Sequence, residues 1–349
     1  MEHATMGTRD YHRRWKTTNY RRILRKQLTM KKILITLLLI PTLCFAWEPT
    51  KPIEAIIAWG PGSVNELLFR ALSKKVEENT NAKFIVINRG GAGGVIGTEE
   101  LSKKPSDGYS VTMVSIPGLA AMDRVSVPGP SRTYTTDSFD YPFFAASMPF
   151  AIVGGASEVL DNPKLFARAI QTRQISIAAT GGARLAYEAM ADKLAIKEDN
   201  AHIVRIDHQS PVAALSDVAG GNVRFAVVPV LVANSFYKDK RVKIVALTGN
   251  RKLPQIPEVA LLNEAIPGFN VSGTWGLILP KGAPKEVLDW YHDEFTKAMN
   301  SPEVRTLYEN NLLLEVSELN TQAAYTAYVK QREVTWKPLV DKVLQKMDK

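Results

Sequence analysis

After residue 50 the sequence alternates between continuous apolar runs, which predict strands, and segments with apolar residues at helical spacing, which predict helices. "PIEAIIAW" (52–59) is a nearly continuous apolar run, which is typical of a buried strand, and "NELLFRALSKKVEENT" (65–80) repeats apolar residues at helical spacing. "KFIVINR" (83–89) and "DGYSVTMVS" (107–115) predict two more strands, with a helix over residues 98–104 between them. This strand–helix order is typical of α/β layers with parallel sheets.

A second alternating series follows after residue 170. Its segments are the strand "QISIAAT" (174–180), the helix "RLAYEAMADKL" (184–194), the strand "HIVRID" (202–207), the helix "PVAALSDVAGG" (211–221), and the strands "VRFAVVPV" (223–230) and "VKIVALTG" (242–249). Residues 139–155 lead into this series and residues 272–284 lead out of it. Two helical stretches, 284–301 and 321–346, end the chain. Two α/β lobes joined by two crossings are the predicted layout.

We therefore predict an α/β fold of two lobes, each with a mainly parallel sheet flanked by helices. Residues 1–46 form a leader, residues 47–149 and 274–349 form lobe one, and residues 150–273 form lobe two.

The segment "MKKILITLLLIPTLCFA" (30–46) has the features of a secretory signal peptide. A basic start precedes an apolar run, and Cys44 and Ala46 have the spacing that signal peptidase requires. A membrane anchor is the alternative, but a span needs about 20 apolar residues and this run has about 14. We expect export to the periplasm and a mature chain that begins at Trp47.

The positive charge of the chain is concentrated in the leader. The whole sequence has a net charge of +9, but residues 1–46 hold ten Lys or Arg against two acidic residues. Residues 47–349 are therefore nearly neutral, which removes the main argument for a nucleic-acid partner. Cys44 is the only cysteine, so the mature chain has neither a disulfide nor a cysteine nucleophile. The sequence leaves open whether translation starts at Met1 or Met30.

The stretch "INRGGAGGVIG" (87–97) raises the question of nucleotide binding. In a dinucleotide fingerprint that starts at Gly91, Gly93 fits but Ile96 stands where the third glycine is required. No Gly-Lys-Ser or Gly-Lys-Thr occurs, which argues against a P-loop. What remains is a loop of backbone N–H groups before a helix, which suits a carboxylate as well as a phosphate. We expect no cofactor.

Two further loops also present backbone N–H groups just before a predicted helix. They are "WGPGSVNE" (59–66) after the first strand and "ATGGAR" (179–184) in the second lobe. The carboxyl ends of strands in open α/β sheets are where ligands bind, so the loops predict one site. The alternative for each loop is a tight turn without a ligand.

Catalytic and metal-binding patterns are missing from the sequence. His202, His208 and His292 have neither zinc-site spacing nor a nucleophile-elbow motif beside them, and we expect them on the surface or in an interface. Glu66 stands near a helix start, where it is expected to cap amides or order a water rather than act as a base. We expect neither an enzyme nor a metal site.

Residues 87–115 resemble the glycine-loop signature of the Bug receptors, the periplasmic solute-binding proteins of tripartite tricarboxylate transporters. The likeness continues through "ALSDVAGGNVRFAV" (214–227), "IVALTGNRKLPQIPEVALLNEAIPGF" (244–269) and "WGLILPKGAPKEVLDWYHDEFTKAMNSPEVR" (275–305). Several ordered motifs over most of the mature chain make the resemblance specific.

The resemblance implies a Venus-flytrap receptor, whose two lobes close on a small carboxylated solute held by backbone amides. It places the binding loops at residues 62–65, 88–94 and 180–183. With Glu66 and two strand-end positions included, the residues expected at the ligand are Gly62, Ser63, Val64, Asn65, Glu66, Asn88, Gly91, Ala92, Gly93, Ser115, Thr180, Gly181, Gly182 and Pro229.

The sequence departs from the family pattern at three places. Ser63 replaces the second glycine of the first loop and Glu66 replaces an aspartate. Ala186 stands where the family often has a histidine, and residues 206–210 lack the usual tyrosine and lysine. The amide loops are retained, whereas the lobe-two specificity residues differ, so no particular solute is implied.

The resemblance implies a monomeric receptor that delivers a small organic acid to the membrane permease subunits of a tripartite transporter. A receptor that presents its ligand-bound form to a sensor kinase, without a role in transport, is the alternative. Neighbouring genes for two membrane subunits would favour the first function, and a neighbouring sensor gene would favour the second.

Overall fold

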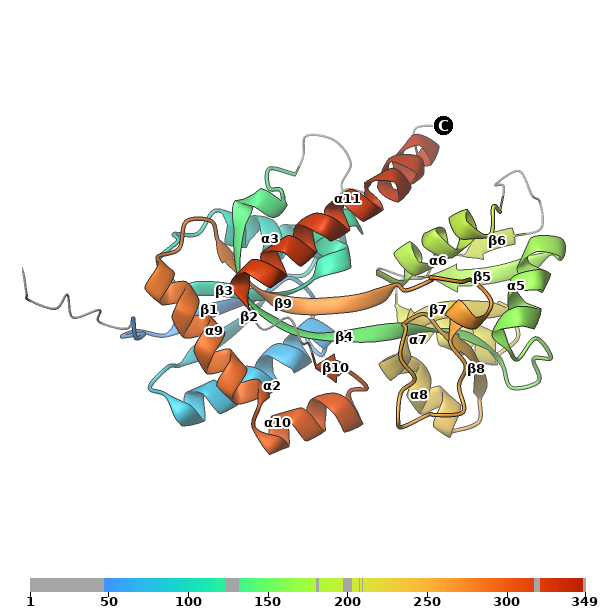
Figure 1. Ribbon diagram of the computed structural model, residues 1–349, viewed down its shortest axis with the longest axis horizontal. Helices are drawn as coiled ribbons and strands as arrows, with labels where there is room; N and C mark the ends of the chain where they lie inside the picture. Colours follow the sequence, from blue (N-terminus) through green and yellow to red (C-terminus); the bar gives the residue numbers. More distant parts are fainter. Residues whose placement is uncertain are drawn as a thin grey trace, which may run out of the picture. The chain divides into compact units, whose positions relative to one another are not determined.

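Two groups of parallel strands are connected by two long antiparallel strands in the computed structural model (Figure 1). The first group has the order β2 (Phe84–Asn88), β1 (Ile53–Ile57), β3 (Ser110–Ser115), and the second has the order β6 (Ile203–Ile206), β5 (Ile175–Ala179), β7 (Phe225–Pro229). The connecting strands are β4 (Phe139–Gly155) and β9 (Ser272–Pro280). The predicted α/β class with two lobes is confirmed, and the parallel pairing is found within each group.

The structure describes residues 47–122, 132–179, 182–196, 203–206, 208, 210–316 and 321–347. The predicted signal peptide and the two candidate start residues lie outside these ranges, as do Thr180, Gly181 and His202. From Trp47 onward the chain forms one compact unit. No helix in the described ranges is both long and apolar enough to cross a membrane.

Helix α2 (Val64–Asn79) starts at a serine cap and buries one face. The Ser63 hydroxyl accepts a hydrogen bond from the backbone N–H of Glu66, which satisfies one of the free donors of the first turn. Leu68, Leu72 and Val76 follow at intervals of four and are fully buried. The cap therefore fixes where the loop after β1 ends, and the buried stripe fixes the orientation of the helix.

Helix α3 (Val95–Ser102) begins three residues earlier than the sequence predicted. Its close approach to β1 depends on Gly97, because a Cβ atom there would lie 2.6 Å from Ala58 Cα and 2.7 Å from the carbonyl oxygen of Arg89. The glycine run thus continues into the helix itself, where the missing side chain allows helix and strand to touch.

Among the described residues, four helices cover the second group of strands, and two of these were predicted from the sequence. The helices are α5 (Pro163–Thr172), α6 (Gly182–Lys193), α7 (Pro211–Ala219) and α8 (Val230–Lys238), of which α5 and α8 were missed. Asn162 and Ser210 cap α5 and α7 through their side-chain oxygens, and a proline follows each cap. A further strand, β8 (Val242–Leu247), pairs antiparallel with β4.

Strands β4 and β9 pair side by side where the chain passes from one lobe to the other. Met148 lies opposite Gly273, and Pro149 lies opposite Ser272. The predicted lobe limits, 149/150 and 273/274, therefore fall on neighbouring positions of one antiparallel pair. Two continuous strands give the connection a defined register, and the limits themselves stay predictions.

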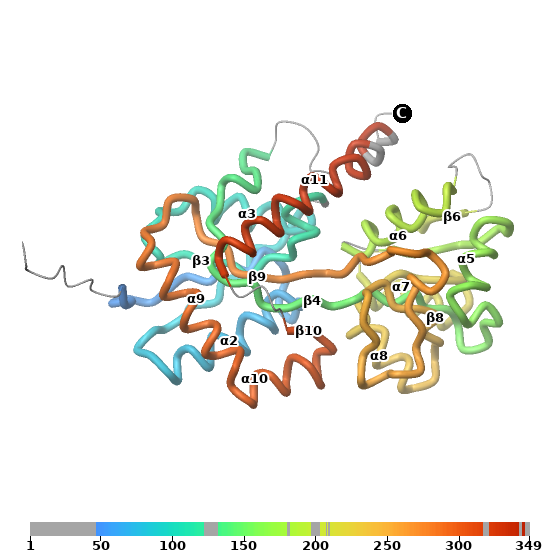
Figure 2. The backbone as a smooth tube through the Cα atoms, viewed as in Figure 1, coloured from blue at the N-terminus to red at the C-terminus, as the bar shows by residue number. Residues whose placement is uncertain are grey.

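The C-terminal part returns to the first lobe. Helix α9 (Lys285–Met299) lies beside α2, as the tube in Figure 2 also shows, and it is followed by α10 (Pro302–Thr306), β10 (Glu315–Val316) and α11 (Gln322–Met347). The two helices predicted at residues 284–301 and 321–346 correspond to α9 and α11. Strand β10 pairs antiparallel with β4, on the edge opposite to β9.

Candidate functional site

The glycine loop after β2 is a run of left-handed backbone conformations. The φ angles are +138° at Gly91, +46° at Ala92, +67° at Gly93 and +107° at Gly94. Gly91 and Gly93, both expected at the ligand, have positive φ. The N–H of Gly94 donates to the carbonyl of Gly91 at 3.0 Å, which closes the turn just before α3. Glycine is required here because other residues rarely adopt these angles.

The loop after β1 is held by one of its own predicted ligand residues. The Glu66 carboxylate accepts hydrogen bonds from the backbone N–H of Gly62 at 2.8 Å and from Arg70 Nε at 2.7 Å. The Gly62 amide, which we expected to face the solute, is therefore already occupied. The expectation that Glu66 caps amides is confirmed.

Glu66 is ionised because its surroundings favour the charged form. The hydrogen bond from Arg70 lowers the pKa of Glu66 below its ordinary value of 4.5, and the bonds from the Gly62 N–H and Asn88 act in the same direction against the opposing effect of burial. Arg70 neutralises this negative charge within the loop. The negative charge of Glu66 is therefore offset by Arg70 and repels a nearby anion only weakly.

The side chains of Asn65 and Asn88 connect neighbouring segments. Asn65 Nδ2 donates to the carbonyl of Met113 at 3.0 Å, and Asn65 Oδ1 accepts from Trp275 Nε1 at 3.0 Å. Asn88 Nδ2 donates to the carbonyl of Trp59 at 3.0 Å. Both asparagines thus help to set the positions of the loops.

Three of the predicted residues line one small cavity at the ends of β1 and β3. This space, which we call the loop cavity, has a volume of about 20 Å³, enough for roughly one water molecule. It is lined by Asn65, Gly93 and Ser115 together with Ala58, Trp59, Gly94, Thr98, Val114, Gly118 and Leu119. Trp59 and Gly118 were not among the residues expected at the ligand, although Trp59 is the first residue of the loop over residues 59–66.

The second lobe reaches this region through Gly182 at the start of α6. A Cβ atom at Gly182 would lie 3.8 Å from Pro117 Cβ and 3.4 Å from Phe150 Cζ. Pro229, at the end of β7, is the strand neighbour of the same Phe150. Gly182 and Pro229 therefore flank one buried aromatic side chain, and Gly182 faces the segment just after Ser115.

Two departures from the family pattern have a structural counterpart. Ala186 is buried in α6. In the 206–210 stretch, His208 bonds Asp217 through Nε2 at 2.7 Å, and its Nδ1 lies 3.3 Å from the Ile206 carbonyl oxygen. The hydrogen bond from His208 lowers the pKa of Asp217.

His292 Nδ1 lies 3.0 Å from the Pro142 carbonyl oxygen, in a partly buried contact.

No group of three or more His, Cys, Asp or Glu side chains in the described ranges is placed to hold a metal ion. The loop cavity is instead lined by small residues, the polar residues Asn65, Thr98 and Ser115, and one tryptophan. Such a lining can bind an anion or a polar group without activating a bond.

The sequence matches the "Tripartite tricarboxylate transporter family receptor" over residues 68–344, which is most of the chain. The protein belongs to this family. A relative from Pseudomonas sp., named for its place in the tcbD-tcbE intergenic region, is 30% identical over 73% of this chain and 76% of its own length. BugT of Bordetella pertussis is 23% identical over 73% and 78%. The resemblance seen in the motifs is thereby confirmed.

Solved structures share the fold of this tripartite tricarboxylate transporter receptor. The periplasmic binding protein BugD matches with a TM-score of 0.70 and 23% identity, covering 85% of this chain and 98% of BugD. MatC from Rhodopseudomonas palustris, solved with bound malate, matches with a TM-score of 0.70 and 17% identity over 84% and 100%. The chain therefore has the two-lobed fold of periplasmic solute-binding proteins, and its family consists of receptors rather than enzymes.

Proposed function

We propose that this receptor binds a small organic carboxylate between its lobes and delivers it to the membrane subunits of a tripartite tricarboxylate-type transporter. The observation that carries the proposal is that the start of α2, the glycine turn and Ser115 meet at one cavity in a chain of this family. MatC, which has a similar fold, was solved with bound malate, a small molecule of the proposed carboxylate class.

The start of α2 supplies donors for the carboxylate. Val64 and Asn65 are the first two helical residues, so their N–H groups have no acceptor inside the helix. No other acceptor for them is present among the described residues. The helix dipole adds positive potential at this end. A carboxylate can therefore be held without a cationic side chain.

The other lobe completes the site when it closes. Gly182 begins α6, a helix of 12 residues, and already faces Pro117 in the first lobe. We propose that the backbone N–H of Gly182, at this helix start, binds the same anion from the second lobe. We propose that the bound solute bridges the two helix starts, that the receptor acts as a monomer, and that residues 30–46 direct it to the periplasm.

A thermal-shift screen of the purified protein tests the proposal. The compounds are mono-, di- and tricarboxylic acids, each paired with its uncharged amide. A ligand present at 100 times its dissociation constant stabilises the folded state by about 2.7 kcal/mol. We expect one or more acids to raise the melting temperature and their amides to have little effect. Equal stabilisation by acids and amides would contradict carboxylate recognition.

Ser115→Ala locates the binding site. The Ser115 side chain lines the loop cavity, and no described residue bonds its hydroxyl. Loss of one hydrogen bond to a carboxylate, about 1.5 to 3 kcal/mol, should weaken binding at least tenfold in calorimetric titration. Ser235→Ala, on the exposed side of α8, is the matched control and should bind as the unaltered protein does. An unchanged affinity in Ser115→Ala would remove this cavity from the site.

A further inference from the structure

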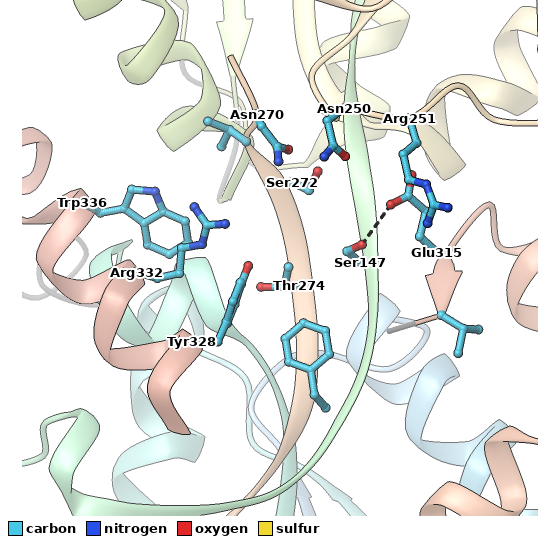
Figure 3. A pocket seen from close by; sticks show the side chains of 13 residues that line it. Ser147, Asn250, Arg251, Asn270, Ser272, Thr274, Glu315, Tyr328, Arg332 and Trp336 are labelled. Atoms are coloured by element: carbon cyan, nitrogen blue, oxygen red, sulfur yellow. Dashed lines mark hydrogen bonds between the residues drawn. The ribbon is translucent and has the colours of Figure 1, made fainter. Parts of the chain in front are cut away.

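A second and larger cavity lies over the crossing strands, away from the loop cavity. It has a volume of about 300 Å³, and no residue lines both cavities. Its floor is formed by β9, β4 and β10, one wall by α11, and the other wall by the segment between β8 and β9 (Figure 3). We call it the hinge pocket and define it by Ser147, Arg251, Thr274, Glu315, Arg332 and Trp336.

The floor carries a row of polar side chains across three strands. Thr274 of β9 lies opposite Ser147 of β4, and Ser147 lies opposite Glu315 of β10. Ser147 Oγ donates to Glu315 Oε2 at 3.5 Å. The Thr274 hydroxyl is buried and has no hydrogen-bond partner among the described residues. A buried hydroxyl without a partner costs free energy, which a bound polar group would offset.

On the α11 wall, Arg332 has no ion-pair partner among the described residues. The Arg332 guanidinium stacks on Tyr328 at 4.8 Å and on Trp336 at 5.8 Å from the ring centroids. Its Nε is buried without a hydrogen-bond partner, and no carboxylate of the described residues forms an ion pair with it. Figure 3 shows this guanidinium and the Trp336 ring together on one side of the pocket. The two aromatic rings hold the cation in place while its donors stay available.

The charges of the pocket favour an anion. Arg251 and Arg332 contribute two guanidinium groups, against the single carboxylate of Glu315. Burial raises the pKa of Glu315, while Arg251 and the hydrogen bond from Ser147 oppose that rise. One positive charge is therefore in excess. Phe144, Val271 and Val316 add apolar surface to the lining, which suits a ligand with a hydrocarbon body.

We propose that the hinge pocket is a second binding site, for a small organic carboxylate with a planar apolar body, whose carboxylate accepts hydrogen bonds from Arg332. The volume of the pocket fits a ligand of the size of benzoate. Such a ligand contacts α11 on one side and the 250–251 segment on the other. It thereby joins two parts of the chain that meet over the crossing strands. The proposal does not depend on what the loop cavity binds.

Tryptophan signals distinguish the two cavities, because Trp59 lines the loop cavity and Trp336 lines the hinge pocket. The indole N–H resonances of ¹⁵N-tryptophan-labelled protein are followed during titration with benzoate and, separately, with uncharged benzamide. Trp336→Phe and Trp59→Phe assign the two signals. We expect benzoate to shift the Trp336 signal at concentrations up to about 10 mM, well above the roughly 1 mM dissociation constant expected for so small a ligand. Benzamide should shift it at least tenfold less readily.

Three variants test the assigned contacts by the same titration. Arg332→Gln should weaken benzoate binding at the Trp336 signal at least tenfold, and Arg332→Lys should weaken it less because the charge remains. Glu315→Gln should tighten binding because a like charge is removed. Arg241→Gln is the matched control, since Arg241 stacks on Phe236 outside the pocket at 4.3 Å.

Three results of these titrations would contradict benzoate binding in the hinge pocket or its assigned contacts. A Trp336 signal that benzoate does not move, or that benzamide moves equally, would overturn carboxylate binding in the hinge pocket. Unaltered binding in a folded Arg332→Gln protein would overturn the role of that guanidinium. A response of the Trp59 signal alone would place benzoate in the loop cavity and leave the hinge pocket without a ligand. Failure of the loop cavity to bind any acid leaves these readouts unchanged, so the two proposals fail separately.

Discussion

Glu66 shows how a residue predicted at the ligand can serve the loop instead. Its carboxylate receives the Gly62 N–H, Arg70 Nε and, at 3.3 Å, Asn88 Nδ2. The side chain is only 8% exposed, so these bonds are protected from water. The carboxylate therefore fixes the backbone just before the first amides of α2.

Glu66→Gln should destabilise the protein in a pH-dependent way. Because the folded-state pKa of Glu66 lies below its ordinary value of 4.5, its contribution is fully present above that value and is lost as the pH falls through the folded-state pKa. We expect urea unfolding at pH 7 to show a loss of about 1 to 2 kcal/mol. The difference from the unaltered protein should shrink in acid, below the folded-state pKa.

The exposed pair of Glu309 and Arg305 provides the control for this measurement. Their side chains are 42% and 47% exposed, so Glu309→Gln should change the free energy of unfolding by less than about 0.5 kcal/mol. A Glu66→Gln protein as stable as Glu309→Gln at pH 7 would show that the loop does not depend on this carboxylate.

Residue-level features were predictable where local chemistry decides them. Gly91 and Gly93 have positive φ because a glycine-rich turn before a helix calls for it, and this could be predicted without a partner. The bond between Asn65 and Trp275 joins residues 210 positions apart, and nothing local to either residue indicates it. The sequence therefore placed Asn65 at the site but could not separate its side-chain role from its backbone role.

At the scale of elements, the contact between α3 and β1 explains why the glycine run extends beyond the turn. Gly97→Ala places a Cβ atom against the backbone of both Ala58 and Arg89, and neither backbone can move without shifting β1 or the turn. We expect a loss of about 1 to 3 kcal/mol in the free energy of unfolding. Thermal or chemical denaturation without ligand measures it.

Gly60→Ala is the matched substitution for Gly97→Ala. A Cβ atom at Gly60 would have nothing within 4 Å, and the φ angle of Gly60 is not in the left-handed range. The change should leave stability the same or raise it by about 0.4 to 1 kcal/mol, because alanine restricts the unfolded chain. An equal loss of unfolding free energy in both variants would mean that the close approach of α3 to β1 at Gly97 is not the cause of the destabilisation.

Most elements with a strand-like or helical apolar pattern were predicted. Helix α8 was missed because it begins at Val230, inside the apolar run that was predicted as a strand over residues 223–230. Helix α5 was missed although its 10 residues exceed the 8 of α3, which was predicted. Strand β4 contains Pro142 and Pro149, which usually argue against a long strand. Its continuity depends on pairing with β9, which is distant in sequence.

At the scale of the molecule, the two cavities differ in how far sequence could reveal them. The loop cavity is built from segments that each end a strand, so a topological rule brings them together. The hinge pocket takes residues from β4, the 250–251 segment, β9, β10 and α11, and no rule of that kind joins them. Its row of Thr274, Ser147 and Glu315 follows only from strand register.

The paired strands β4 and β9 make the whole molecule suited to hinge closure. The chain crosses between lobes only in these continuous strands among the described residues, and a bend spread over their shared register moves one lobe as a body. We expect a carboxylate found in the thermal-shift screen to reduce the radius of gyration in small-angle scattering by about 1 Å, from the roughly 19 Å expected for a domain of this size.

Ser115→Ala is the control for closure, since it should need a higher concentration of the same acid to produce the same change. Benzoate, if confined to the hinge pocket, provides a second comparison, because it contacts α11 and the 250–251 segment without touching the loop cavity. An unchanged radius of gyration at saturation of the loop cavity would exclude lobe closure as the means of capture. Since binding itself would still be measured by calorimetry, that result would point to a receptor whose lobes are already closed before the solute enters.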